Sequence, residues 1–119
     1  MKQIILIIGL LSLLLLPSCN AQGSSGVSKL KELASQDLTL IVDVRTPQEF
    51  ESGHYEKSVN IPLDLLPDSI DSLRRYKSII TICRSGNRSE TAKKILNNKG
   101  FDNVYNGGGW RQFQSIINQ

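Results

Sequence analysis

Along this chain, continuous runs of apolar and β-branched residues alternate with segments in which apolar residues recur at helical spacing. The runs at 38–44 and 78–82 predict strands buried on both faces, because strands covered by helices on two sides lose the apolar–polar alternation of half-buried ones. Shorter segments at 59–61 and 103–105 predict two more strands. This alternation predicts an α/β fold, with an open, mainly parallel sheet and helices on both faces.

Helices are expected between these strands. One of them has a well-defined start, because Thr46 can cap it, Pro47 suits its first position and Glu49 can complete a capping box. Gly53 is expected to end this helix. The other expected helices lie around 30–34, 68–76, 90–98 and 113–117.

The segment 83–89, Cys-Arg-Ser-Gly-Asn-Arg-Ser, lies where the strand 78–82 ends and a helix is expected to begin. Helix N-termini carry unpaired N–H groups and partial positive charge, so a thiol there has its nucleophilic thiolate form favoured. Arg84 and Arg88 add charge and planar donors suited to an oxyanion. The alternative is that Cys83 is an unreactive residue that only fills space in the core, but that role would require neither the two arginines nor the glycine of the loop. The pattern therefore favours a reactive Cys83.

This loop resembles the active-site loop of single-domain rhodaneses, the sulfurtransferases that carry sulfur as a cysteine persulfide. Other segments resemble further motifs of that family, in the same order along the chain: Asp43–Phe50, Gly53-His54 with Val59–Pro62, and Val104–Asn106 with Gly108-Gly109. Together these motifs extend over about residues 28 to 118. A chance match to one loop would not give such an ordered series.

Two departures from the family pattern change what is expected of the structure. Lys57-Ser58 replaces a usual Gly-Ala pair, so the turn before the Asn-Ile-Pro segment is expected to be built differently. The place of a usual tryptophan is taken by Phe113, whereas Trp110 follows the glycines directly. We expect Phe113 to pack the last helix on the sheet and Trp110 to lie partly at the surface, near the site.

The resemblance implies a three-layer rhodanese-like fold and an activity of the thiosulfate sulfurtransferase type. Cys83 would accept sulfur from thiosulfate or a similar donor and pass it to cyanide or a thiol. The implied substrate-binding residues are Arg84, Ser85, Gly86, Asn87, Arg88 and Ser89.

Other polar residues are expected to support this loop rather than to react. Asp43, Arg45 and Glu49 are expected to hold the neighbouring loop after the first strand. Arg88 has two interpretations: a contact with the donor anion, or a structural pair with a carboxylate such as Asp43 or Glu49. His54 is expected to be structural, because an ionised thiol needs no general base.

Three rival functions deserve comparison. Cysteine phosphatases that share the rhodanese fold place an arginine six residues after the cysteine, whereas here that position is Ser89 and the arginine comes one residue earlier. The shorter loop fits a sulfur atom better than a phosphoryl group. A non-catalytic binding or sulfur-carrier module remains an alternative, although such modules often lack the cysteine. A thiol redox protein is disfavoured because the chain has no C-x-x-C motif.

The N-terminus resembles a bacterial lipoprotein signal peptide. A basic start is followed by the apolar run 4–16, too short to span a bilayer comfortably, and then by a lipoprotein box that ends at Cys19. Residues 1–18 are thus expected to be removed, leaving a lipidated Cys19 that anchors an exported protein in the bacterial cell envelope, facing the periplasm or in the outer membrane. Residues 19–27 would form a flexible linker and 28–119 the rhodanese-like domain.

Other interpretations of the N-terminus remain open. An ordinary signal peptide could be cut near residues 20–22, or the apolar run could stay as an uncleaved anchor. In an unlipidated protein, a Cys19–Cys83 disulfide would block the loop. If Cys19 is acylated, Cys83 has no cysteine partner, which suggests a reactive thiol.

Composition narrows the partners. The chain carries 14 Lys and Arg against 11 Asp and Glu, without a basic run interleaved with aromatic residues, so no nucleic-acid partner is expected. One histidine and two cysteines do not supply a zinc ligand set, and no metal or cofactor is expected. The expected partners are small sulfur-containing anions, thiol acceptors and, through the lipid, a membrane. We expect the domain to be a monomer.

Overall fold

A computed structural model of the chain describes residues 22–119. The signal peptide and the lipidated Cys19 lie outside these residues and stay predictions. Among the residues that the structure describes, no helix combines the length and the apolar character needed to cross a membrane.

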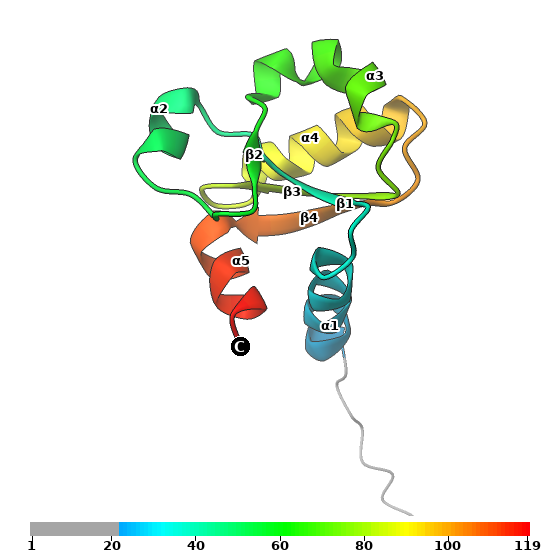
Figure 1. The fold of residues 1–119 in the computed structure, drawn as a ribbon. Helices are drawn as coiled ribbons and strands as arrows, with labels where there is room; N and C mark the ends of the chain where they lie inside the picture. Colours follow the sequence, from blue (N-terminus) through cyan, green and yellow to red (C-terminus); the bar gives the residue numbers. More distant parts are fainter. Residues whose placement is uncertain (1–21) are drawn as a thin grey trace, which may run out of the picture.

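Four strands form one parallel sheet in the order β2-β1-β3-β4 (Figure 1). They are β1 (Thr39–Asp43), β2 (Val59–Asn60), β3 (Ser78–Cys83) and β4 (Val104–Gly109). The carboxyl ends of parallel strands meet at one edge, which is where ligands bind in open α/β sheets. The predicted parallel sheet is confirmed, and β3 brings Cys83 to that edge as its last residue.

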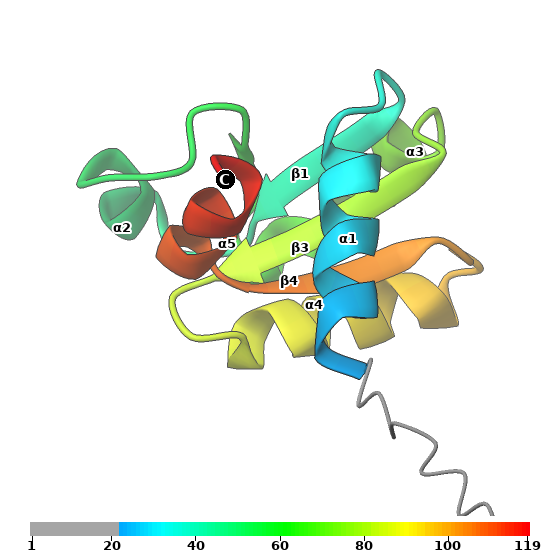
Figure 2. The ribbon, with the colours of Figure 1, turned by 90° about the horizontal axis from the view of Figure 1, so that it is seen from below.

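Helices cover both faces of the sheet, so the molecule has the predicted three layers (Figure 1, Figure 2). One face carries α1 (Gln22–Ala34) and α5 (Trp110–Ile117). The other carries the 3-10 helix η1 (Leu63–Ser69) and the helices α3 (Ile70–Leu73) and α4 (Asn87–Asn98). The short α2 (Pro47–Glu51) lies beyond the carboxyl ends of the strands, and Thr46 and Glu49 form its predicted capping box.

β3 contributes to both halves of the hydrophobic core. Ile80 and Ile82 pack with Phe113 in the half that contains the α1 and α5 side chains. Ile79 and Cys83 belong to the half formed with α3 and α4. All residues of β3 are buried, and this two-sided burial explains why the sequence of the strand lacks polar alternation.

The predicted helix at 68–76 differs from the structure. A 3-10 helix that contains Pro67 precedes a short α-helix, Ile70–Leu73, and the chain turns toward β3 soon afterwards. The α-helix ends early because the residues after Leu73 bond elsewhere: Tyr76 N–H donates to the Leu73 carbonyl in a turn, and Lys77 N–H donates to the Leu38 carbonyl before β1. Ile70 and Leu73 nonetheless point inward, as expected, and are 8% and 2% exposed.

Two other boundaries also differ from the prediction. β4 continues past the predicted end at 105 through Gly107, Gly108 and Gly109. Glycine is depleted in strands, so the sequence pattern placed the end of this strand too early. α1 begins at Gln22 and thus includes residues 22–27, which were expected in the linker. Once a helix has formed, each added residue gains a hydrogen bond, and this offsets the low helix propensity of Gly and Ser.

Gly107 of β4 packs against side chains of β3 and α5. A Cβ atom at this position would be 2.7 Å from Ile82 Cγ2, 2.9 Å from Ile80 Cγ2 and 3.1 Å from Phe113 Cδ2. These neighbours are fully buried and have no room to move away. The absence of a side chain at Gly107 is therefore a packing requirement.

We predict that Gly107→Ala lowers the free energy of unfolding by about 1–3 kcal/mol, the usual cost of overpacking a core. Urea unfolding followed by circular dichroism measures this change. Gly26→Ala is the matched control, because a Cβ at Gly26 in α1 meets nothing within 4 Å. The control should leave stability unchanged or raise it slightly. Equal midpoints for wild type and Gly107→Ala would contradict the packing argument.

Candidate active site

Cys83 ends β3, and the chain then turns through Arg84–Gly86 into the N-terminus of α4. The turn depends on Gly86, whose φ of 102° lies in the left-handed region that glycine adopts without strain. This conformation directs the Gly86 N–H at the Cys83 sulfur, with 3.0 Å between N and Sγ. The predicted arrangement of a cysteine in front of a helix N-terminus is therefore present.

The thiol of Cys83 is buried, with 1% of the residue exposed, and has no disulfide partner among the described residues. Burial raises the pKa of this thiol. Hydrogen bonds lower the pKa by more, and they come from the Ser89 hydroxyl and from the backbone N–H groups of Ser89, Ser85 and Gly86. The pKa of Cys83 is therefore below its ordinary value, as expected for a thiolate stabilised by hydrogen bonds.

Ser89 connects the Cys83 sulfur to Asn106 of strand β4, a residue that the sequence analysis did not identify as part of the site. Cys83 Sγ donates to Ser89 Oγ at 3.4 Å, and Ser89 Oγ donates in turn to Asn106 Oδ1 at 2.6 Å. When the thiol ionises, the Ser89 hydroxyl can turn from Asn106 and donate to the sulfur. Asn106 Oδ1 also accepts from Gly108 N at 2.9 Å, and its Nδ2 donates to Gly86 O at 3.1 Å. Asn106 thus holds both the hydroxyl and the loop backbone. The sequence offered one signal for Asn106, its place in a family motif directly before three glycines, but this did not indicate its contacts.

Asp43 and Arg45 form a buried ion pair below the neighbouring loop. Arg45 Nη2 is 2.7 Å from Asp43 Oδ2, and Arg45 Nε is 2.9 Å from Asp43 Oδ1. Arg45 also donates to the carbonyls of Glu49 and Gly53, at 3.2 and 2.8 Å. Asn60 adds donations to the carbonyls of Asp43 and Arg45. These contacts agree with the supporting role expected for Asp43 and Arg45.

Arg88 forms a two-pronged ion pair with Glu49, 39 positions earlier in the chain. Its Nη1 and Nη2 donate to the two carboxylate oxygens of Glu49 at 2.6 and 2.9 Å. Of the two interpretations of Arg88, the geometry favours the structural pair. The hydrogen bond from Arg88 lowers the pKa of Glu49 to about 2. Because this pKa is depressed, the stabilisation is present above about pH 4.5 and is lost as the pH falls through about 2.

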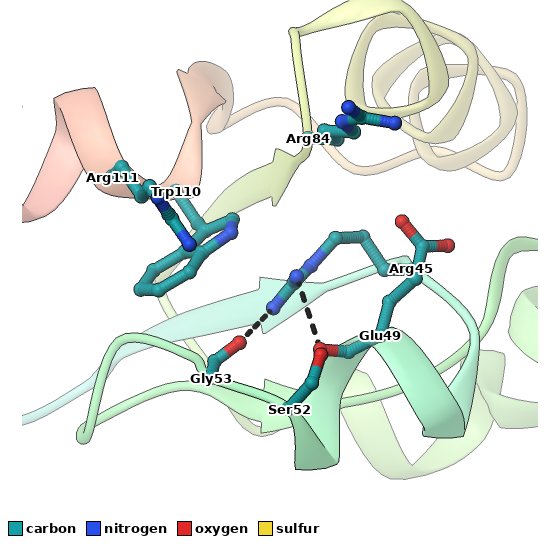
Figure 3. Close-up of a pocket in the computed structure, with 7 residues that line it drawn as sticks. All are labelled: Arg45, Glu49, Ser52, Gly53, Arg84, Trp110 and Arg111. Atoms are coloured by element: carbon teal, nitrogen blue, oxygen red, sulfur yellow. Dashed lines mark hydrogen bonds between the residues drawn. The ribbon is translucent and has the colours of Figure 1, made fainter.

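A cavity of about 410 Å³ opens beside the loop (Figure 3). Its lining residues come from the loop after β1, from α2 and the turn that follows it, from the Cys83 loop and from α5; they are Arg45, Glu49, Ser52, Gly53, Arg84, Trp110 and Arg111. Cys83 is not among them; it lies buried next to Arg84. Trp110 is half-buried beside the site and Phe113 is fully buried, as the departures from the family pattern predicted. Arg111 was not singled out by the sequence.

The remaining candidate residues are also placed by the structure. Ser85 and Asn87 are exposed on the loop, and Asn87 begins α4. His54 stacks on Phe50 with 3.7 Å between the ring centroids, and its Nδ1 is 2.8 Å from the Phe50 carbonyl oxygen. This position agrees with a structural role. In the part of the chain from 22 to 119, His, Cys, Asp and Glu side chains form no group able to hold a metal ion.

We predict that Ser89→Ala raises the pKa of Cys83, because the substitution removes the hydroxyl that lowers it. The pH dependence of alkylation by iodoacetamide measures this pKa. Ser85→Ala is the matched control, since Ser85 lowers the pKa through its backbone N–H, which the substitution keeps. If Ser89→Ala and Ser85→Ala give the same alkylation profile, the Ser89 hydroxyl does not stabilise the thiolate.

Comparison with known proteins agrees with this geometry. Residues 26–116 match the family described as rhodanese-like domain. A tRNA uridine(34) hydroxylase from Yersinia pestis (strain Pestoides F) is 38% identical over 73 residues, which cover 56% of this chain and 21% of that protein. The chain thus spans about a fifth of the length of the curated relatives that it matches.

Two solved structures show the same fold. A rhodanese with anions from E. coli is 31% identical, with a TM-score of 0.57 and coverage of 61% of this chain and 88% of that one. A rhodanese-related protein from Thermoplasma volcanium is also 31% identical, with a TM-score of 0.62 and coverage of 75% and 87%. With the sheet, the loop and these matches in agreement, the chain belongs to the rhodanese-like domain family.

Proposed function

We propose that this domain is a sulfurtransferase that carries sulfur as a persulfide on Cys83. The observation that carries the proposal is the environment of the sulfur. Sγ accepts a backbone N–H from Gly86 at 3.0 Å and lies 3.4 Å from the Ser89 hydroxyl, and the pKa of the thiol is lowered. These groups stabilise negative charge on a sulfur atom, which is the charge that both the thiolate and the persulfide carry.

The proposed reaction has two displacements. The Cys83 thiolate attacks the outer sulfur of thiosulfate, a bond forms between the two sulfurs, and the S–S bond of the donor breaks as sulfite leaves with the electron pair. Cyanide or a thiolate then attacks the terminal sulfur of the persulfide. Thiocyanate or a new persulfide leaves, and the Cys83 thiolate returns. Each step conserves charge, and neither needs a metal or a general base.

The position of Arg88 supports sulfur transfer over phosphoryl transfer. In a cysteine phosphatase loop the arginine contacts the phosphoryl oxygens, but here both prongs of the Arg88 guanidinium are engaged by Glu49. Arg88 also comes one residue too early for the phosphatase spacing. The named activity of the longer curated relatives is not carried over, because the chain corresponds to about a fifth of their length.

We predict that thiosulfate adds the mass of one sulfur atom to the purified protein and that cyanide removes it. Intact-mass spectrometry measures both changes. Cys83→Ser keeps the size of the side chain without the thiol and should show no uptake. Uptake by Cys83→Ser equal to that of the wild type would contradict the proposal. Strong hydrolysis of an aryl phosphate by the wild type would instead support the phosphatase alternative.

A second prediction concerns Arg84, which lies next to Cys83 and lines the cavity. Arg84→Ala should raise the KM for thiosulfate and lower kcat/KM by about tenfold, since a charge-assisted contact contributes about 1.5–3 kcal/mol and exposure weakens it. The melting temperature should change little because the side chain is exposed. Lys94→Ala, which removes an exposed charge from α4, is the control. An unchanged kcat/KM would remove Arg84 from the donor site.

A further inference from the structure

The charged side chains that line the cavity have an excess of positive charge. Two of the lining groups, Arg45 and Glu49, have close partners of opposite charge. Arg45 is paired with Asp43 at 2.7 Å, and Glu49 is paired with Arg88 at 2.6 Å. Each of these pairs is neutral as a unit, so neither adds net charge to the cavity.

Arg84 and Arg111 are the other charged residues of the lining, and among residues 22–119 neither forms a salt bridge. They come from different elements, Arg84 from the loop after β3 and Arg111 from the first turn of α5. Figure 3 shows Arg111 beside the Trp110 ring and Arg84 on the neighbouring loop. The cavity lining therefore carries two positive charges without an acidic partner, and one of them, Arg84, directly follows Cys83 in the chain.

Arg111 is held in place although it is exposed. Its guanidinium carbon lies 5.1 Å from the centroid of the Trp110 ring, and the Arg45 guanidinium carbon lies 5.0 Å from the same centroid. Trp110 is also packed closely against Gly53, where an added Cβ would be 3.3 Å from Cη2. Stacking on a fixed ring restricts the guanidinium while its N–H groups remain free to donate, so less entropy is lost when an anion binds.

We propose that Arg111, together with Arg84, makes this site selective for dianionic sulfur donors over monoanionic ones. The inference rests on the proposed function, and it adds a residue outside the Cys83 loop that sets substrate class. Thiosulfate, with two negative charges, matches the two arginines. An alkanethiosulfonate has the same sulfane sulfur but one charge, because an alkyl group replaces one oxygen.

Both donors undergo the same balanced step, which isolates the effect of charge. With thiosulfate, the thiolate gains the outer sulfur, the S–S bond breaks and sulfite leaves with two negative charges. With methanethiosulfonate, the same bond breaks and methanesulfinate leaves with one. A preference for thiosulfate that depends on Arg111 therefore reports recognition of the second charge rather than a change in chemistry.

Binding is tested first without reaction. Cys83→Ser cannot take up sulfur, so sulfate and methanesulfonate serve as unreactive probes of the dianion and the monoanion. Calorimetry gives their Kd values, and fluorescence gives a second readout, since Trp110 is the only tryptophan of the chain. We expect sulfate to bind about five- to tenfold more tightly than methanesulfonate, from one additional charge contact near water. Equal affinities would overturn the proposal.

Arg111→Gln in the same background is then compared with Arg75→Gln. Arg75 is a matched control, because it is also exposed and stacked on an aromatic ring, 5.0 Å from the centroid of Tyr76, but it precedes β3 at the opposite end of that strand. Arg111→Gln should weaken sulfate binding about five- to tenfold, change methanesulfonate binding less, and reduce the salt dependence of the sulfate Kd. The proposal fails if Arg111→Gln and Arg75→Gln behave alike.

Sulfur uptake with Cys83 intact separates the two proposals. The ratio of kcat/KM for thiosulfate to that for methanethiosulfonate should fall about five- to tenfold in Arg111→Gln and stay constant in Arg75→Gln. If the wild type takes up no sulfur from either donor while Cys83→Ser still selects sulfate through Arg111, the sulfurtransferase proposal fails and the dianion site remains. If sulfur is taken up with an unchanged ratio in Arg111→Gln, the dianion proposal alone fails.

Discussion

The stabilisation of the Cys83 sulfur depends on hydrogen bonds that reach it from two directions. The Gly86 N–H approaches along the loop, and the Ser89 hydroxyl approaches from the first turn of α4. Desolvation alone would keep a buried thiol neutral, so these donors determine that its pKa is lowered. They are held in turn by Asn106, which binds both the Ser89 hydroxyl and the Gly86 carbonyl. The lowered pKa of Cys83 thus depends on the attachment of the loop to β4.

Charge pairing separates two kinds of arginine at the carboxyl end of the sheet, those with an acidic partner and those without one. The Asp43–Arg45 pair is buried, and its desolvation is offset by many hydrogen bonds, including those to the carbonyls of Glu49 and Gly53. The Arg88–Glu49 pair joins α4 to α2. Because both pairs are internally neutral, the arginines that we propose for anion binding are those of the cavity lining without an acidic partner, Arg84 and Arg111. Under this proposal, different guanidinium groups stabilise the fold and bind the anion.

The sequence predicted the features that depend on local chemistry and missed those that depend on distant segments. The apolar run before Cys83, the loop and the Thr46 capping box are each contained within a few consecutive residues, and all are present as predicted. The partner of Arg88 could not be chosen, because Glu49 is 39 positions away. Asn106 and Arg111 reach the site only because the fold places β4 and α5 beside it, which the local sequence does not reveal. The end of β4 was also missed, because its three glycines are untypical of strands and are required by contacts with residues distant in sequence.

Those glycines limit how the site can be redesigned. Gly107 has no space for a Cβ, Gly108 has a φ of 78°, and a Cβ at Gly109 would be 2.7 Å from the Arg84 carbonyl oxygen. Gly107 and Gly109 thus lack space for a side chain, and Gly108 has a backbone conformation that would strain one, so no single compensating mutation could relieve all three positions. An engineer who wishes to admit a bulkier donor has little freedom along β4. Ser52, by contrast, lines the cavity, is exposed and carries no part of the core, so its side chain can be changed more freely.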